Sequence, residues 1–176
     1  EKLPAPLVSC LMPTADRRAF VPQAVEYFLR QDYPRRELIV LDDGSDPVAD
    51  LIPDDERVRY LRLEGRQSIG AKRNRGAREA RGALLANWDD DVWYAPWRLS
   101  YQVAALLERG AGLTGIENLL HYDPFSQQAW HSHRPPGSRP WMPGSTYLYR
   151  KSFWEARPYP NTQPLSLIHI SEPTRL

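Results

Sequence analysis

A short apolar run that ends in three consecutive aspartates constrains the fold of this 176-residue chain more than any other stretch. Residues 83–88 are mostly apolar, and Asp89, Asp90 and Asp91 follow them directly. Such a run is typical of an inner strand of a parallel sheet, and open α/β sheets bind ligands at the carboxyl ends of their strands. Because side chains alternate along a strand, we expect Asp89 and Asp91 to point to one side and Asp90 to the other.

The three adjacent carboxylates carry like charges, so a positive group should neutralise them. A divalent cation, Mg²⁺ or Mn²⁺, is the expected partner, because these ions prefer oxygen ligands and also bind substrate phosphates. The alternative is a solvated acidic turn that caps the next helix, since helix N-termini favour acidic side chains.

Strand and helix patterns alternate along the rest of the chain and predict a three-layer α/β domain, with a parallel-rich sheet and helices on both faces. Ser68 is the expected N-cap of the second helix, and Gly82 is expected to end it. The predicted strands are residues 7–12, 37–41, 58–63, the run before Asp89, 113–116 and 145–149. The predicted helices are residues 19–31, 68–81, 96–109 and a short one from Ser152.

Composition indicates one domain of ordinary globular character. The formal net charge is +1, so bulk electrostatics select no class of partner. The single cysteine, Cys10, excludes an internal disulfide and fits a reducing compartment. No apolar run approaches the roughly 18 residues of a membrane span. We therefore expect a cytoplasmic protein without a transmembrane segment, and peripheral attachment to a membrane stays open.

The end of the chain differs in character from the rest. Residues 165–176 resemble the in-frame translation of a sequencing-library adapter. We therefore expect residues 1–164 to form the domain, truncated at its C-terminal end, and residues 165–176 to be a non-native tail. His169 is then not a candidate ligand.

A basic helix lies between two acid clusters that end two strands. Asp42 and Asp43 follow one strand, and residues 89–91 follow another, so both clusters should share one edge of the sheet. Acids that hold a metal, beside cationic side chains and a helix N-terminus, suit a diphosphate. A solvated basic face is the alternative for the later arginines, and the flanking acids disfavour nucleic-acid binding. The helix carries Lys72, Arg73, Arg75, Arg78 and Arg81.

Several short motifs occur in a specific order between about residues 7 and 100. They are Pro13-Thr14, Gln31-Asp32-Tyr33-Pro34, Asp42-Asp43-Gly44-Ser45-Asp46, Gly70-x-x-Arg73-Asn74-x-Gly76, Asp89-Asp90-Asp91 and Pro96-x-Arg98-Leu99. Each motif is modest alone, but together their order and spacing resemble those of family 2 glycosyltransferases, which have the Rossmann-like GT-A fold.

The resemblance implies an inverting, metal-dependent, hexosyltransferase-like enzyme that moves a sugar from a nucleotide-diphosphate donor to an acceptor hydroxyl. It implies that Asp43 holds the nucleobase in a pocket lined by Pro13, and that Asp89-x-Asp91 is the DxD motif. The implied donor-binding residues are Pro13, Thr14, Asp43, Arg73, Asn74 and Asp90, and the implied Mn²⁺ or Mg²⁺ ligands are Asp89 and Asp91.

Three departures from the family pattern bear on activity. Ala15-Asp16 stands where an aromatic residue and Asn are common, and the tract around residues 144–154 matches the acceptor border only loosely. The general base of the family should follow Gln163, where the adapter-like tail stands. Because general-base help is typically worth about 10²–10⁴ in rate, we expect this chain to bind donor and transfer little sugar.

Other readings remain open at the level of sequence. A non-catalytic nucleotide-binding domain and a Mg²⁺-dependent nucleotidyl transferase would use similar acids on a similar sheet. His131 and His133 could ligate a metal, or they could be residues of an acceptor loop or of the surface; Asp123 could contact an acceptor or be a stray carboxylate. Aromatic residues could stack on a sugar or pack in the core: Trp130, Trp141, Trp154, Tyr122 and Tyr147.

Overall fold

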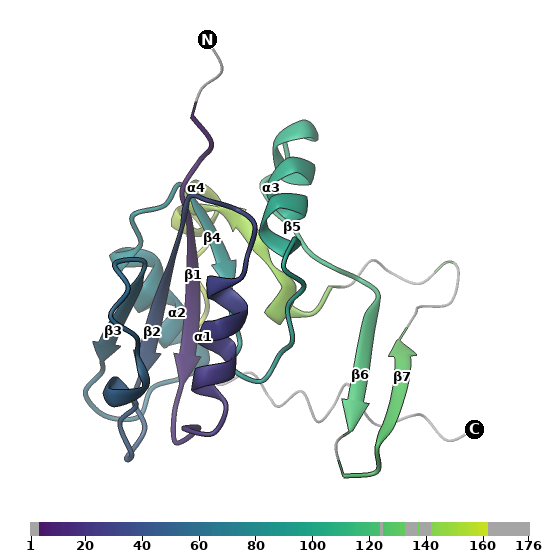
Figure 1. The fold of residues 1–176 in the computed structure, drawn as a ribbon. Coiled ribbons are helices and arrows are strands. Elements are labelled where there is room, and N and C mark those ends of the chain that lie inside the picture. Colours follow the sequence, from purple (N-terminus) through teal and green to yellow (C-terminus); the bar gives the residue numbers. More distant parts are fainter. Residues whose placement is uncertain (1–3, 124, 133–136, 138–141, 162–176) are drawn as a thin grey trace.

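The computed structural model describes residues 4–123, 125–132, 137 and 142–161, and a six-stranded sheet forms its centre (Figure 1). The strand order is β3-β2-β1-β4-β8-β5. The four parallel strands are β1 (Val8–Thr14), β2 (Arg36–Asp42), β3 (Val58–Arg62) and β4 (Leu84–Asn87). Strand β8 (Leu148–Arg150) runs antiparallel to β4 and to β5 (Leu113–Thr114).

Helices cover both faces of the sheet, which confirms the predicted three-layer architecture (Figure 1). Helices α1 (Val21–Leu29) and α3 (Arg98–Glu108) pack on one face, and α2 (Ile69–Glu79) and α4 (Lys151–Ala156) pack on the other. Ser68 caps α2 as predicted, because its hydroxyl accepts a hydrogen bond from Ala71 N.

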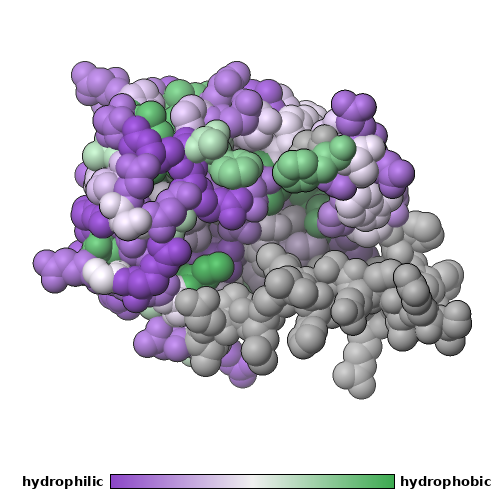
Figure 2. All heavy atoms as spheres, turned by 90° about the horizontal axis from the view of Figure 1, so that it is seen from below, coloured by the Kyte–Doolittle hydropathy of each residue, from purple (hydrophilic) through white to green (hydrophobic). Residues whose placement is uncertain are grey.

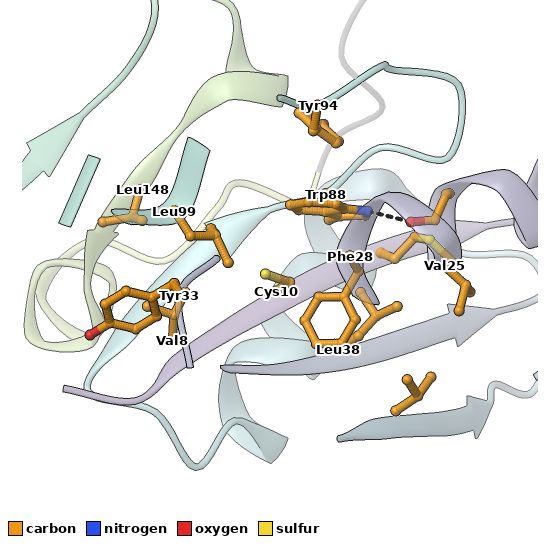
Figure 3. Close-up of a cluster of buried hydrophobic side chains, with 14 of the residues drawn as sticks. Val8, Cys10, Val25, Phe28, Tyr33, Leu38, Trp88, Tyr94, Leu99 and Leu148 are labelled. Atoms are coloured by element: carbon orange, nitrogen blue, oxygen red, sulfur yellow. Dashed lines mark hydrogen bonds between the residues drawn. The ribbon is translucent and has the colours of Figure 1, made fainter. Parts of the chain in front are cut away.

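Alternation along the buried strands divides the core into two clusters. In β1, Cys10 and Met12 join the cluster under α1 and α3, whereas Leu11 joins the cluster under α2. The α1 side is anchored by buried Trp88, whose indole nitrogen donates to Ala24 O at 3.1 Å (Figure 3). Because both faces of β1 are buried, this strand is apolar almost throughout.

Helix α2 lies close to the sheet because it carries a glycine where it crosses the sheet. A Cβ added to Gly76 would lie 2.8 Å from Leu41 Cδ1 and 3.1 Å from Leu11 Cδ2. A larger residue there would push the helix away from the sheet. The distance between the sheet and the other side chains of α2 is therefore fixed by this close contact.

Three local expectations were wrong. The strand predicted at residues 145–149 begins only at β8, because a 3₁₀ turn at Gly144–Thr146 precedes it and the Thr146 hydroxyl donates to Pro143 O. The strand predicted at residues 113–116 is limited to β5. The segment between residues 116 and 145, which was expected to be a loop rich in aromatic residues and His, forms a separate hairpin of β6 (Leu119–Asp123) and β7 (Gln128–Ser132), apart from the main sheet (Figure 1).

None of the helices in the described ranges is both long and apolar enough to cross a membrane.

Candidate active site

The carboxyl ends of β1, β2 and β4 meet at one edge of the sheet. Thr14 pairs with Asp42 in the register of β1 and β2, and Leu11 pairs with Asn87 in that of β1 and β4. Figure 2 looks at the molecule from this edge and shows mainly hydrophilic side chains in its described part. The two acid clusters therefore border one site, as predicted.

Thr14 connects the two acid clusters through hydrogen bonds. Its hydroxyl donates to Asp90 Oδ2 at 2.7 Å, and its carbonyl accepts from Lys72 Nζ at 3.1 Å. Lys72 Nζ also donates to Asp43 Oδ1 at 2.7 Å, and both of these side chains are buried. One buried ammonium thus neutralises the acid that follows β2.

Two arginines neutralise the acids that follow β4. Arg73 on α2 donates to Asp89 Oδ1 at 2.8 Å. Arg17, in the loop between β1 and α1, lies 3.1 Å from Asp90 Oδ1 and donates to Asp91 Oδ2 at 2.7 Å. Arg73 was expected on the donor side of the site, whereas Arg17 was not predicted at all. Its signal in the sequence is only a cationic residue shortly after β1.

The predicted alternation of the three aspartates holds only in part. The side chain of Asp90 is 6% exposed and points inward to Thr14, whereas those of Asp89 and Asp91 are 24% and 47% exposed. Strand β4, however, ends at Asn87, and Asp90 and Asp91 lie in a turn, so both reach Arg17. Burial raises the pKa of Asp90, although Thr14 and Arg17 oppose the rise.

The acids after β2 have separate roles. The Asp42 carboxylate accepts from Gly44 N at 2.9 Å, Val48 N at 3.0 Å and the Tyr60 hydroxyl at 2.8 Å, and so shapes the loop that follows β2. Asp43 accepts from Gln67 N as well as from Lys72, so both of its oxygens are engaged. Because the Asp43 side chain is fully buried, a nucleobase could reach it only if a neighbouring group moves aside.

Asp16, one of the departures from the family pattern, organises two loops. It adopts a left-handed backbone with φ 57°, which Asn and Asp tolerate better than most residues. Its Oδ1 accepts from Ser45 N at 2.6 Å and Asp46 N at 3.1 Å, and its Oδ2 pairs with Arg66. The hydrogen bond from Asp46 N, with those from Ser45 and Arg66, lowers the pKa of Asp16 to about 2. Asn could also accept the two backbone hydrogen bonds at Oδ1, but only the carboxylate can form the ion pair with Arg66.

Tyr94 and Arg98 hold the chain at the end of β4 through hydrogen bonds to its backbone. The Tyr94 hydroxyl accepts from Asp89 N at 2.9 Å and donates to Ser145 O at 3.1 Å. The Arg98 guanidinium donates to Asn87 O at 3.0 Å and lies 4.1 Å from the centre of the Tyr94 ring. Both side chains are buried, and burial raises the pKa of the Tyr94 phenol. The backbone that leads to the three aspartates is thus held at two points, Asn87 O and Asp89 N.

Asn74 lies beside Arg73 but is used within the fold. Its Oδ1 accepts from Trp154 Nε1 at 2.8 Å and Tyr159 N at 3.0 Å, and its Nδ2 donates to Tyr159 O at 2.8 Å. A Cβ on Gly70 would collide with Pro160 O, so the glycine admits this same segment against α2. The expected donor contact of Asn74 therefore competes with three existing hydrogen bonds.

The remaining candidates do not join the site in the described residues. Arg75 pairs with Glu79 at 2.9 Å on an exposed face, as the alternative reading of the basic helix proposed. Trp130 stacks on His121 in the separate hairpin, and Asp123 accepts from Phe125 N and Ser126 within its own turn. Trp154 is a core residue. His133, Trp141, Gln163 and the adapter-like tail lie outside the described residues.

The residues present fit a divalent cation that is held partly by its substrate. Within the described ranges, no group of three or more His, Cys, Asp or Glu side chains is arranged to hold a metal ion. Asp89 and Asp91 each use one carboxylate oxygen in the ion pairs above, so each has a second oxygen to offer. One or two carboxylates completed by phosphate oxygens are a usual arrangement for Mg²⁺.

The family model for glycosyl transferase family 2 matches residues 9–166. The chain belongs to this family. It is 31% identical over 152 residues to the putative colanic acid biosynthesis glycosyl transferase WcaA of Escherichia coli. The aligned region covers 82% of this chain and 52% of that protein. It is also 29% identical over 114 residues to the putative teichuronic acid biosynthesis glycosyltransferase TuaG of Bacillus subtilis. That aligned region covers 62% of this chain and 45% of that protein.

Solved structures of glycosyltransferases confirm the GT-A fold of this family 2 member. Residues 1–349 of S. aureus TarS with UDP align at a TM-score of 0.73 and 17% identity, over 90% of this chain and 52% of that one. The mannosyltransferase PcManGT of Pyrobaculum calidifontis, with GDP-Man and Mn²⁺, aligns at 0.71 and 18%, over 90% of this chain and 48% of that one. The chain spans about half the length of these relatives.

Proposed function

We propose that this glycosyltransferase domain binds a nucleoside-diphosphate sugar at the carboxyl edge of the sheet and transfers the sugar with inversion. The observation that carries the proposal is that Lys72 pairs with Asp43 and Arg73 pairs with Asp89 at the same edge of the sheet, beside Asp91. Fixed cations beside carboxylates suit a diphosphate, which binds both cationic side chains and a metal. Structures of TarS with UDP-GlcNAc and of PcManGT with GDP-Man support this class of donor.

The donor would lie across the edge with its nucleoside near β2 and its diphosphate near β4. Pro13 and Asp43 would contact the nucleobase, and Gln67 would give up its backbone hydrogen bond to Asp43 in exchange. Thr14 and Asp90, which are already joined at 2.7 Å, would face the ribose. On the α2 side, Arg73 would contact the phosphates and Asn74 would support that contact.

Asp89 and Asp91 would hold a divalent cation, Mn²⁺ or Mg²⁺, through the carboxylate oxygens that their ion pairs leave open. When bound, the cation would neutralise charge that develops on the departing nucleoside diphosphate. The chain's own contribution is to hold the donor between α2 and β4 and to keep its phosphates beside Arg73.

We also propose that donor binding and sugar transfer are separable in this chain. Inversion requires a base that deprotonates the acceptor hydroxyl, and Glu155 on α4 is exposed to solvent. The base is expected after Gln163, where the adapter-like residues 165–176 follow, so we expect measurable donor affinity together with slow transfer.

The test is equilibrium binding of UDP, GDP and their sugars to the purified chain, with Mn²⁺ or with EDTA. We expect affinity for at least one nucleotide that requires Mn²⁺, and Asp91→Asn should abolish the Mn²⁺-dependent part. Asp54→Asn, at an exposed aspartate away from this edge, is the matched control. Equal affinity of the Asp91→Asn variant and the wild type would remove the metal assignment.

The released product then identifies the reaction. Release of a nucleoside diphosphate indicates glycosyl transfer, and release of pyrophosphate would instead indicate a nucleotidyl transferase. Binding without either product, in a chain that continues past the expected base, would indicate a non-catalytic nucleotide-binding domain.

A further inference from the structure

Arg17 lies where it restrains one of the two proposed cation ligands. Its guanidinium donates from Nη2 to Asp91 Oδ2 at 2.7 Å and places Nε 3.1 Å from Asp90 Oδ1. The centre of its guanidinium also lies 4.6 Å from the ring centre of Phe20. Arg17 is thus held at three points, and only one of them is the proposed ligand Asp91.

The contact with Asp90 is close but poorly aligned. Arg17 Nε is buried and lies 3.1 Å from the Asp90 carboxylate, yet it makes no hydrogen bond to the described residues. Parallel, well-aligned bonds from both nitrogens would form the stronger two-point pairing of arginine with a carboxylate. Arg17 instead spreads over two aspartates, so the loss of one contact leaves the other in place.

The two proposed ligands are held unequally. Asp89 pairs with Arg73, whose side chain is 13% exposed, whereas Asp91 is 47% exposed and pairs with Arg17, which is 39% exposed. Exposed ion pairs contribute little to stability, because water and salt screen them. The Arg17–Asp91 pair is therefore the easier of the two to open.

We propose that Arg17 competes with a divalent cation for Asp91, because its positive charge lies against one carboxylate oxygen while the other oxygen would ligate the ion. This inference rests on the metal site of the proposed function. The guanidinium opposes a second positive charge at Asp91, and it can turn about its contacts with Asp90 and Phe20 when the cation arrives. Arg17 is a positioning residue that lowers metal affinity in the absence of donor.

The experiment titrates the nucleotide-free chain with Mn²⁺ and measures unbound Mn²⁺ by electron paramagnetic resonance. Arg17→Ala should bind Mn²⁺ about three- to fivefold more tightly than the wild type, which corresponds to the loss of one competing exposed ion pair. Arg18→Ala is the matched control, because Arg18 is the next residue but pairs with Asp46 and Asp50. Its affinity should stay within about twofold of the wild type.

A second variant separates charge from packing. Arg17→Met keeps an apolar stem beside Phe20, and it should also bind Mn²⁺ more tightly if charge competition is the cause. Unchanged or weaker affinity in both Arg17 variants would overturn the proposal, as would an absence of Mn²⁺ binding in all variants. Because nucleotide is omitted, a failure of donor binding in the earlier test is a separate result.

Discussion

The buried ammonium of Lys72 lies 2.7 Å from Oδ1 of Asp43, and this pair joins α2 to the loop after β2. The same ammonium reaches Thr14 O, so three segments depend on one cation. Removal of one member of a buried pair leaves an uncompensated charge.

Lys72→Met should therefore lower the free energy of unfolding by about 3–5 kcal/mol. Urea denaturation measures the loss, and Arg78→Met, at an exposed position on the same helix, should change stability by less than about 0.5 kcal/mol. The double variant Lys72→Met with Asp43→Leu should recover part of the loss. Additive losses in the double variant would contradict the pairing.

Tyr94→Phe should weaken the support beneath Asp89. The variant loses the hydroxyl that accepts from Asp89 N and donates to Ser145 O, and we expect a stability loss of about 1–3 kcal/mol. Mn²⁺-dependent nucleotide binding should also weaken, because the backbone before the proposed ligands is freed. Tyr101→Phe, at a tyrosine that is 61% exposed, serves as the control. Unaltered binding and stability in Tyr94→Phe would show that the hydroxyl supports nothing.

Asn74→Ala should release the segment that follows α4. Three hydrogen bonds to Trp154 and Tyr159 are lost, so we expect destabilisation of about 2–3 kcal/mol and a change in Trp154 fluorescence. Arg75→Ala removes the exposed neighbour and should have little effect. If Asn74→Ala weakens nucleotide binding without any loss of stability, its role lies with the donor rather than in the fold.

Asp16→Asn should lower stability at neutral pH but not in strong acid. The pKa of Asp16 in the folded chain is about 2, below its ordinary value of 3.8, so protonation favours the unfolded state. The stabilisation is present above about pH 4 and is lost as the pH falls through about 2. Urea denaturation at pH 7, 4 and 2.5 should show a shrinking difference between wild type and variant. A difference that is constant with pH would contradict the assignment.

Sequence patterns predicted the inner strands of the sheet, because burial on both faces requires apolar side chains there. The runs around Cys10, Leu38 and Leu85 are apolar on both faces, so they had to be inner strands, and their acidic ends had to share an edge. The β6–β7 hairpin was missed because its strands are largely exposed and carry no clear alternation of apolar residues. The 3₁₀ turn before β8 depends on Thr146 and Pro143, a tertiary detail with no periodic signal.

The sequence predicted the edge of the sheet at which the candidate site lies, but it did not predict which side chains pair with the acids there. Asp89 to Asp91 and Arg73 could be placed together from strand and helix order. Arg17 could not, because its reach depends on the loop that holds Asp16 in a left-handed conformation. The hydrogen bonds of Asn74 were also hidden, since they join residues 80 and 85 positions apart in the chain.

Consecutive residues of α2 bind acids that follow two different strands: Lys72 reaches Asp43 after β2, and Arg73 reaches Asp89 after β4. Strand β1 separates those two strands, so the acids are attached to strands about 10 Å apart. A single helix, seated close to the sheet through Gly76, thereby sets the span between the two acid clusters. A tilt of α2 would move Lys72 and Arg73 together, so a ligand that displaces one of these side chains through the helix would also displace the other.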